Sequence, residues 1–171
     1  MNIEENTNNV TREKITEVRE RERSSSYHRL ENINNKENKI ISNDFGVIIQ
    51  KIDPVFIDER GIITDLLNEP ISHVGLITTE KDAVRANHYH KLSTQYSYIL
   101  QGKFEVLIAP YDQQSNIKKV IVNVGELITI PPYVIHQFKA LDRAIMIDMV
   151  SESRAGAGFE DDTVRVKINE N

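Results

Sequence analysis

Three histidines and one glutamine are the residues of this chain whose types and spacing best suit chemistry. His88 and His90 are separated by one residue, and on a β-strand that spacing directs both imidazoles to the same face of the sheet. Gln95 could reach the same region if a new strand begins after a short bend. His136 lies far downstream, in a second strand–turn–strand unit. Three imidazoles and one amide that converge inside a β-barrel would form either a divalent-metal site or an acid–base site.

Both kinds of site make definite demands on these residues. Neutral imidazole nitrogens suit Zn, Fe, Mn, Ni or Cu rather than Mg or Ca, so His88, His90, Gln95 and His136 are candidate ligands of a divalent transition metal. Without a metal, enolisation beside a ketone needs one group of near-neutral pKa that removes a proton and another that returns it, and histidine meets that need. The site therefore holds either a transition metal or no cofactor.

The composition restricts the classes of protein to which the chain can belong. Its 171 residues with 39% hydrophobic content are enough for one domain with a core. A net charge of −5 argues against a general nucleic-acid-binding protein, and the absence of cysteine excludes disulfides and thiolate chemistry. Apolar runs are too short to cross a bilayer, and the first residues do not resemble a signal peptide. We expect a cytoplasmic protein that binds neither nucleic acid nor membrane.

Residues 1–43 differ from the rest of the chain because they are rich in charged and polar residues and poor in large apolar ones. Thr11 to Arg23 could form a short helix, but its apolar stripe is too thin to hold it against a core. We expect a flexible or partly helical N-terminal extension. The alternative is an arm that binds a partner or mediates oligomerisation.

Residues 44–171 consist of short β-rich runs separated by turn residues, with no helical periodicity of any length. The Gln101-Gly102 pair between two apolar runs indicates a tight hairpin. Strands in such number and spacing favour an all-β domain, an antiparallel sandwich or barrel. The expected strands span residues 47–52, 56–57, 62–67, 73–78, 83–88, 96–100, 103–109, 117–122, 127–130, 134–138, 144–150 and 164–168.

Two segments of this β-rich region resemble the motifs of the cupin superfamily. The resemblance implies a jelly-roll barrel of antiparallel strands. Gln95 departs from the family pattern, which has glutamate there, and Tyr133 stands where the family often has glycine. A site with Gln95 would carry one more positive charge than the usual one, so it should hold its metal less tightly and make it a stronger Lewis acid. The matching residues are His88-Tyr89-His90, Gln95 and Gly102 in the first segment, and Gly125, Pro131 and His136 in the second.

Shorter segments resemble sugar-nucleotide cupins. Arg85 to Lys91, RANHYHK, is similar to a stretch of dTDP-sugar 3,4-ketoisomerases and of cupin domains in capsular-polysaccharide enzymes. Asp58 to Gly61 and Pro131 to Phe138 resemble segments of dTDP-4-dehydrorhamnose 3,5-epimerases. The tyrosine that those epimerases use as an acid has no counterpart here, because no tyrosine follows Tyr133.

These resemblances imply an isomerase or epimerase that acts on a nucleotide-linked keto-sugar in surface polysaccharide synthesis. His88 would be the catalytic base, and His90 and His136 would bind a metal or polarise the carbonyl group. The implied substrate-binding residues are Arg85 and Arg60 for the phosphates and Tyr96 and Tyr98 for the sugar ring. Strand alternation places Arg85 and His88 on opposite faces unless a bulge lies between them.

Two alternatives remain open at this point. The first is a metal-dependent dioxygenase that uses iron at the same four residues. The second is a non-catalytic cupin that binds a small molecule. In each case we expect a homodimer, because edge strands of such barrels commonly pair between subunits.

Overall fold

The computed structural model describes residues 40–166 and 168. They belong to two compact units: residues 54–64 form a hairpin, and the remaining described residues form a β-sandwich. The helix expected at residues 11–23 lies outside the described residues. The division of the chain at residue 43 stays a prediction; the first described strand begins at Ile40. No helix in the described part is long and apolar enough to cross a membrane.

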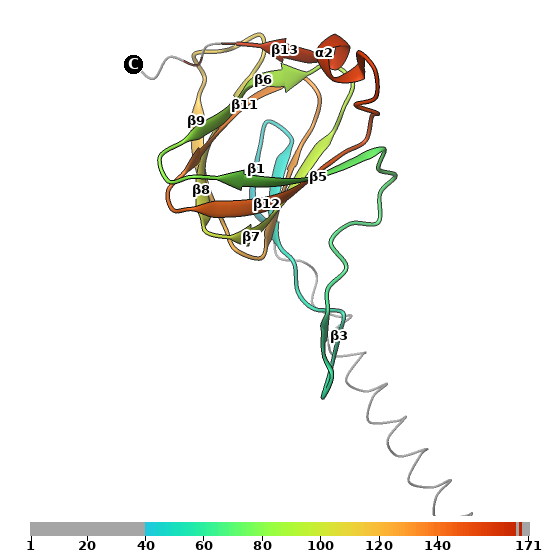
Figure 1. Cartoon of the computed structure of the whole chain (residues 1–171). Coiled ribbons are helices and arrows are strands. Elements are labelled where there is room, and N and C mark those ends of the chain that lie inside the picture. Colours follow the sequence, from blue (N-terminus) through green and yellow to red (C-terminus); the bar gives the residue numbers. More distant parts are fainter. Residues whose placement is uncertain (1–39, 167, 169–171) are drawn as a thin grey trace, which may run out of the picture. The chain divides into compact units, whose positions relative to one another are not determined.

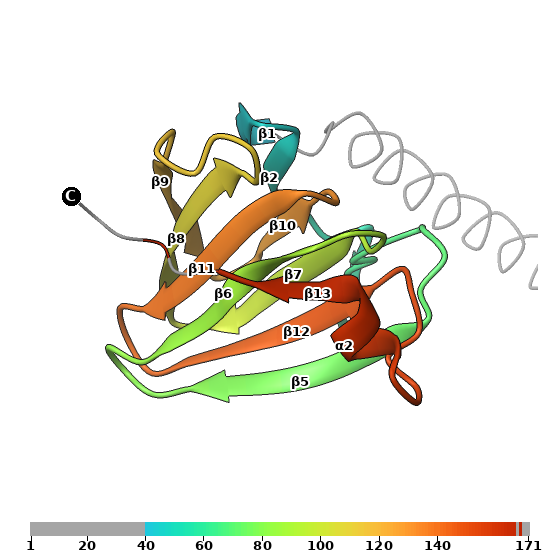
Figure 2. The ribbon, with the colours of Figure 1, turned by 90° about the horizontal axis from the view of Figure 1, so that it is seen from above.

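The sandwich consists of two antiparallel sheets that face each other (Figures 1 and 2), which confirms the predicted all-β fold. The six-stranded sheet contains, in spatial order, β1 (Ile40–Asp44), β2 (Val47–Lys51), β10 (Glu126–Ile130), β7 (Gln95–Gln101), β12 (Ala144–Val150) and β5 (His73–Thr79). The five-stranded sheet contains β13 (Thr163–Arg165), β6 (Val84–His90), β11 (Val134–Ala140), β8 (Lys103–Pro110) and β9 (Lys118–Asn123). A short helix, α2 (Gly158–Asp162), precedes β13.

The space between the sheets is apolar at one end and polar at the other. Phe104 and Phe138 meet edge to face, with ring centroids 5.7 Å apart, and both are fully buried. Toward the other end the inward positions are polar, such as His136 on β11 and Ser97 on β7. The apolar end supplies the hydrophobic stabilisation of the fold, so the polar end is available for chemistry.

The hairpin in residues 54–64 pairs β3 (Phe56–Asp58) with β4 (Gly61–Ile63). Its turn contains Arg60, which forms an ion pair of 2.6 Å with Asp58. The strand predicted at residues 62–67 ends at Ile63, and the chain from Thr64 to Ser72 is irregular. The apolar residues of this stretch, Leu66, Leu67 and Ile71, instead pack on the outer face of the six-stranded sheet.

A bulge in β6 sets the orientation of the residues around the first motif. His88 pairs with His136, but the next pair is Ala86 with Gln137, so Asn87 is left without a partner in β11. Ala86 and Asn87 have φ angles of 69° and 58°, which non-glycine residues rarely adopt. The extra residue places Arg85 and His88 on the same side of the sheet. Strand alternation predicted this arrangement only if a bulge lay between them.

The tight hairpin predicted at Gln101-Gly102 is wrong, because β7 and β8 belong to different sheets and the turn between them carries the chain from one sheet to the other. This turn still allows a matched test of the fold. Gly102 has a φ of +72°, and a Cβ there would lie 2.6 Å from the Arg143 carbonyl oxygen. Gly156 has a similar φ of +61°, but a Cβ there would meet nothing within 4 Å. We expect Gly156→Ala to lower the free energy of unfolding by about 1 kcal/mol, and Gly102→Ala by about 2–4 kcal/mol, because it adds a backbone clash to the φ strain. Urea unfolding of both variants measures the difference, and equal losses would contradict this reading.

Candidate metal centre

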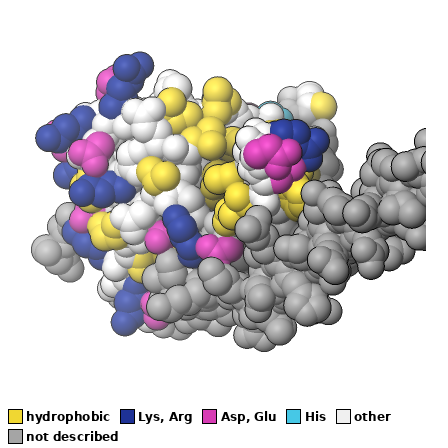
Figure 3. Space-filling model, turned by 90° about the horizontal axis from the view of Figure 1, so that it is seen from below, with side chains coloured by type: hydrophobic (Ala, Val, Ile, Leu, Met, Phe, Trp, Pro, Cys, Tyr) yellow, Lys and Arg dark blue, Asp and Glu magenta, His cyan; other side chains and the backbone are white. Residues whose placement is uncertain are grey.

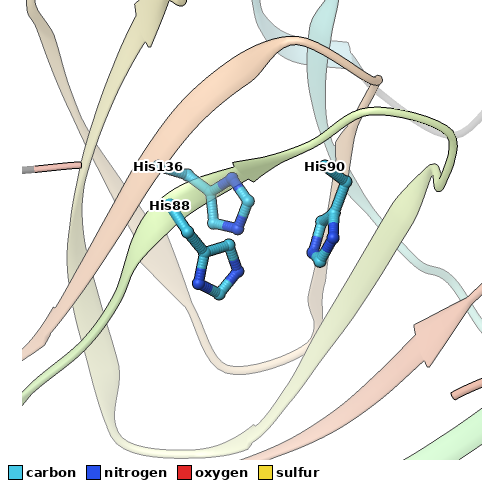
Figure 4. Close-up of side chains that lie close together, drawn as sticks. All are labelled: His88, His90 and His136. Atoms are coloured by element: carbon cyan, nitrogen blue, oxygen red, sulfur yellow. The ribbon is translucent and has the colours of Figure 1, made fainter. Parts of the chain in front are cut away.

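Three imidazoles converge at the polar end of the sandwich (Figure 4). His88 and His90 lie on β6, and His136 lies on the neighbouring strand β11, directly opposite His88. One nitrogen from each ring lies within 4.8 Å of the others. His136 and His90 are buried, and His88 is partly exposed. The three histidines could therefore hold one metal ion.

His88 and His136 each present a free ring nitrogen to this space. The Nδ1 atom of His136 lies 3.0 Å from the Val134 carbonyl oxygen, so it carries the proton that this contact requires. The backbone of Ala86 interacts with His88 in the same manner. The Nε2 atoms of both rings are buried and have no hydrogen-bond partner. Buried polar atoms nearly always have a partner, and a metal ion would supply one to each Nε2 lone pair.

His90 contacts polar groups through both ring nitrogens. Its Nδ1 atom lies 3.1 Å from the Oδ2 atom of Asp162, the last residue of α2. Its Nε2 atom lies 3.2 Å from the Oε1 atom of Gln95, so the predicted approach of Gln95 to the histidines is found in the structure. Two ligands bound about 2.1 Å from one ion lie about 3–3.4 Å apart, so this spacing is also suitable for joint coordination.

The orientation of the Gln95 amide follows from a buried chain of hydrogen bonds. The Asp148 carboxylate can only accept, so Ser97 donates its proton to Asp148 at 2.9 Å. The Ser97 oxygen must then accept from the Gln95 amide nitrogen, at 3.2 Å. Arg154 completes the chain by donating to Asp148 at 3.0 Å. Gln95 is thereby required to direct its carbonyl oxygen, and not its NH2 group, toward His90.

The electrostatics of the site keep the imidazoles neutral. Burial, followed by the charges of His90 and Arg154, lowers the pKa of His88 to about 4. Burial also lowers the pKa of His90, although Asp162 and Gln95 act in the opposite direction, and it lowers the pKa of His136 well below its usual value. Neutral imidazole is the form that binds metals, so protons do not compete for these nitrogens at neutral pH. The donor set therefore fits a transition metal, provided that the widest spacing of 4.8 Å contracts on binding.

The segment that follows β12 forms one wall of the site. The Phe159 ring of α2 lies edge-on to His88 and His90, with centroid distances of 6.2 and 6.4 Å. The Arg154 guanidinium lies over the Phe159 ring, 5.0 Å from its centroid. Figure 2 shows α2 and β13 beside the end of β6 that carries the histidines. An apolar ring and a cation thus adjoin the imidazoles.

The other predicted site residues are not grouped with the histidines. Tyr96 and Tyr98 lie on the opposite face of β7 from Gln95 and Ser97, and they pack in an apolar cluster on the outside of the sheet. Figure 3 views this side of the molecule, where hydrophobic side chains gather. Arg85 donates to the Thr79 side chain and to the Thr78 carbonyl oxygen on β5. Arg60 belongs to the separate hairpin.

Sequence reasoning missed several residues of the site, namely Ser93, Ser97, Asp148, Arg154, Phe159 and Asp162. One of them carries a visible signal, because Asp148 is a single acid within the apolar run AIMIDMV, where a buried charge needs a partner. Asp162 carries no such signal in the sequence, because it is the third of three consecutive acidic residues. Only the fold buries it, while the two acidic residues before it are exposed.

Comparison with known proteins identifies the family. Residues 66–157 match the Cupin family, so the chain belongs to the cupins. None of the curated proteins in the comparison matches the chain.

Solved structures with the same fold include sugar-nucleotide enzymes. One is a dTDP-4-dehydrorhamnose 3,5-epimerase from Sulfolobus tokodaii, with 17% identity, 76% of this chain and 82% of that chain covered, and a TM-score of 0.62. A 3,4-ketoisomerase from Helicobacter canadensis has 21% identity, coverage of 71% and 92%, and a TM-score of 0.61. A sugar 3,4-ketoisomerase from Thermoanaerobacterium thermosaccharolyticum, in complex with TDP, has 23% identity, coverage of 71% and 88%, and a TM-score of 0.57. At these identities the likeness shows the fold.

The lowered pKa of His88 predicts that the metal-free protein loses stability in acid. The unfolded chain takes up a proton at His88 near pH 6.5, whereas the folded chain does so only near pH 4. Stability therefore falls as the pH drops from 6.5 to 4, by about 2–3 kcal/mol for this residue. The test is urea unfolding at pH 7 and at pH 4.5. Between these two pH values, the free energy of unfolding should fall by about 2 kcal/mol less for His88→Gln than for the unaltered protein. His73→Gln is the control and should behave as the unaltered protein does; the same acid loss in His88→Gln would refute the prediction.

Proposed function

We propose that this cupin binds a divalent transition metal and isomerises or epimerises a nucleotide-linked keto-sugar. The observation that carries the metal is the pair of buried, unpartnered Nε2 atoms of His88 and His136. The substrate class is supported by the fold shared with dTDP-sugar epimerases and ketoisomerases and by the RANHYHK stretch. Surface polysaccharide synthesis is the corresponding role.

The residues divide the chemistry between them. A bound metal would act as a Lewis acid and polarise the substrate carbonyl group. His136, His90 and Gln95 would hold the ion. His88 is the most exposed of the three imidazoles. Its neutral Nε2 has one lone pair, which can serve either as a ligand or as the base, and in the catalytic state it would accept the proton from the carbon next to the carbonyl group. Delivery of a proton to the opposite face of the same carbon by a second group gives an epimer. Delivery to the former carbonyl carbon, with transfer of the neighbouring hydroxyl proton to the former carbonyl oxygen, gives a keto isomer.

The phosphates of the substrate require cations. Arg85 is exposed and lies on the same side of β6 as His88, so we assign it to the diphosphate. Arg60 remains a second candidate for this role. Tyr96 and Tyr98 would reach the sugar only if the outer face of the sheet took part in binding, and their packing there favours a structural role.

A homodimer is part of this proposal. β5 forms one edge of the six-stranded sheet and contains no charged residue. Val74 and Leu76 on this strand are 63% and 68% exposed. An exposed, uncharged edge strand is suited to pairing with a second copy, and light scattering in solution would decide between one and two chains per particle.

A dioxygenase is the second candidate, because three neutral imidazoles also suit iron. A dioxygenase would require iron as the bound metal and would consume oxygen. The identity of the metal therefore separates the two candidates.

Metal content is the first test. Protein purified without an affinity tag should contain about one metal ion per chain by plasma mass spectrometry, since the candidate ligands form one cluster. The His88→Ala/His90→Ala double variant should lose it, whereas His73→Ala should retain it. Zinc or manganese would support the isomerase, and iron with oxygen uptake would support the dioxygenase. No metal after reconstitution with each ion would remove the metal from the proposal.

Isotope exchange tests the chemistry itself. TDP-4-keto-6-deoxyglucose, a ligand of one of the ketoisomerases of the same fold, should take up deuterium next to its carbonyl group when it is incubated with the protein in D2O. His88→Asn should slow this exchange by about 100-fold or more, because it removes the base. NMR spectra of the sugar measure the exchange. If the unaltered protein exchanges no proton, the substrate class is incorrect; if His88→Asn exchanges as fast as the unaltered protein, His88 is not the base.

A further inference from the structure

The four candidate ligands of the metal centre are all electrically neutral, so the counter-charge for a divalent cation must come from outside the ligand set. Two buried carboxylates lie near it, Asp148 and Asp162. Asp148 already forms an ion pair with Arg154. Asp162 instead contacts a candidate ligand directly, because its Oδ2 atom lies 3.1 Å from the Nδ1 atom of His90.

The Asp162 carboxylate is held in a fixed orientation. Its Oδ1 atom accepts hydrogen bonds from the backbone N–H groups of Leu92, at 2.6 Å, and Ser93, at 3.4 Å. Its Oδ2 atom accepts from the Ser93 hydroxyl and faces His90. The side chain is only 8% exposed. Four donors thus converge on one buried carboxylate, which favours its charged form and leaves it little freedom to turn away from His90.

We infer that Asp162 is a positioning residue that supplies, from behind His90, the negative charge that Gln95 does not supply within the ligand set. The inference rests on the proposed metal binding. A carboxylate that accepts the Nδ1 proton fixes the tautomer of the ring and makes Nε2 a stronger electron donor to an ion. The chain thereby has a glutamine among the candidate ligands, and it has a carboxylate that contacts a ligand, His90, rather than the ion itself.

The position of Asp162 also connects the metal with the C-terminal segment. Asp162 ends α2, and the next residues form β13, in which Thr163 pairs with His90 and Arg165 pairs with His88. The Lys91 N–H group donates to the Asp162 carbonyl oxygen at 2.9 Å. If docking of this segment strengthens metal binding, then by thermodynamic linkage metal binding must also strengthen the docking of the segment. Hydrogen exchange of β13 should therefore slow when metal is added.

The test compares Asp162→Asn with Asp161→Asn, the same change at the exposed neighbouring residue of α2. Affinity for Zn²⁺ is measured on the full chain by competition with a chelating dye, and Co²⁺ absorption reports the ligand geometry. Asp162→Asn should bind Zn²⁺ about 10–100-fold more weakly than the unaltered protein, whereas Asp161→Asn should bind within about 2-fold of it. Equal affinities of the two variants would overturn the inference.

A second variant separates the charge of Asp162 from its role as an anchor of the Leu92–Ser93 turn. Gln95→Glu places a carboxylate in the ligand set, so the Gln95→Glu/Asp162→Asn double variant should regain the affinity of the unaltered protein to within a few-fold. A purely structural role predicts no rescue, and it predicts lower thermal stability of the metal-free Asp162→Asn protein that Gln95→Glu does not repair. If the unaltered protein binds no Zn²⁺ or Co²⁺, the proposed metal binding fails and the inference fails with it. If the unaltered protein binds and rescue is absent, only the inference fails.

Discussion

Burial of three imidazoles inside an apolar sandwich requires a partner for every ring nitrogen, and the polar contacts of this protein follow from that requirement. Each histidine meets it at one nitrogen: His136 through a backbone carbonyl of its own strand, His88 through the bulged backbone of β6, and His90 through Asp162. The Nε2 atom of His90 faces the Gln95 oxygen, which cannot donate a proton to it. Two Nε2 atoms remain unpartnered, and both belong to rings whose other nitrogen is engaged. An unsatisfied buried nitrogen costs about 1–3 kcal/mol, so a sequence that retains two of them side by side has a use for them. The rest of the sandwich supplies the hydrophobic stability that offsets this cost.

The geometry that brings the rings together is a property of strand register. β6 and β11 pair so that His88 faces His136, and the bulge at Asn87 preserves this pair while it changes the direction of every residue before it. A shift of one residue would move the histidines of β6 to the outside of the barrel. The register is in turn fixed by the apolar positions farther along β11 and β8, where Phe138 packs against Phe104. The same strands therefore carry the core at one end and the candidate metal centre at the other.

The sequence was sufficient to predict those features that depend on local periodicity. The spacing of His88 and His90 places both on one face because strand side chains alternate, and the Gln101-Gly102 pair marks a turn between two strands. The expected pairing of those two strands does not occur, because β7 and β8 lie in different sheets. Features that depend on the path of the chain could not be predicted in this way. Asp162 reaches His90 only because a short helix turns the C-terminal segment back onto β6. Tyr96 and Tyr98 were correctly expected to share a face, but alternation alone does not say which face is inside; Gln95 and Ser97 occupy it because their side chains have buried partners there.

In the proposed isomerase, the charges around the site would have a definite role. Removal of a proton beside a ketone leaves negative charge on the carbonyl oxygen, and a catalyst of that step needs preorganised positive charge near this oxygen. Arg154 is such a charge, held in place by Asp148 and by the face of Phe159. Its influence on the site is evident because it contributes to the lowered pKa values of His88 and His90. A neutral ligand set would add to this effect, because even with Asp162 behind His90 it leaves more of the charge of an ion available to the substrate than a glutamate ligand would. In the proposed reaction, the glutamine at position 95 and the arginine at position 154 would therefore both favour the enolate.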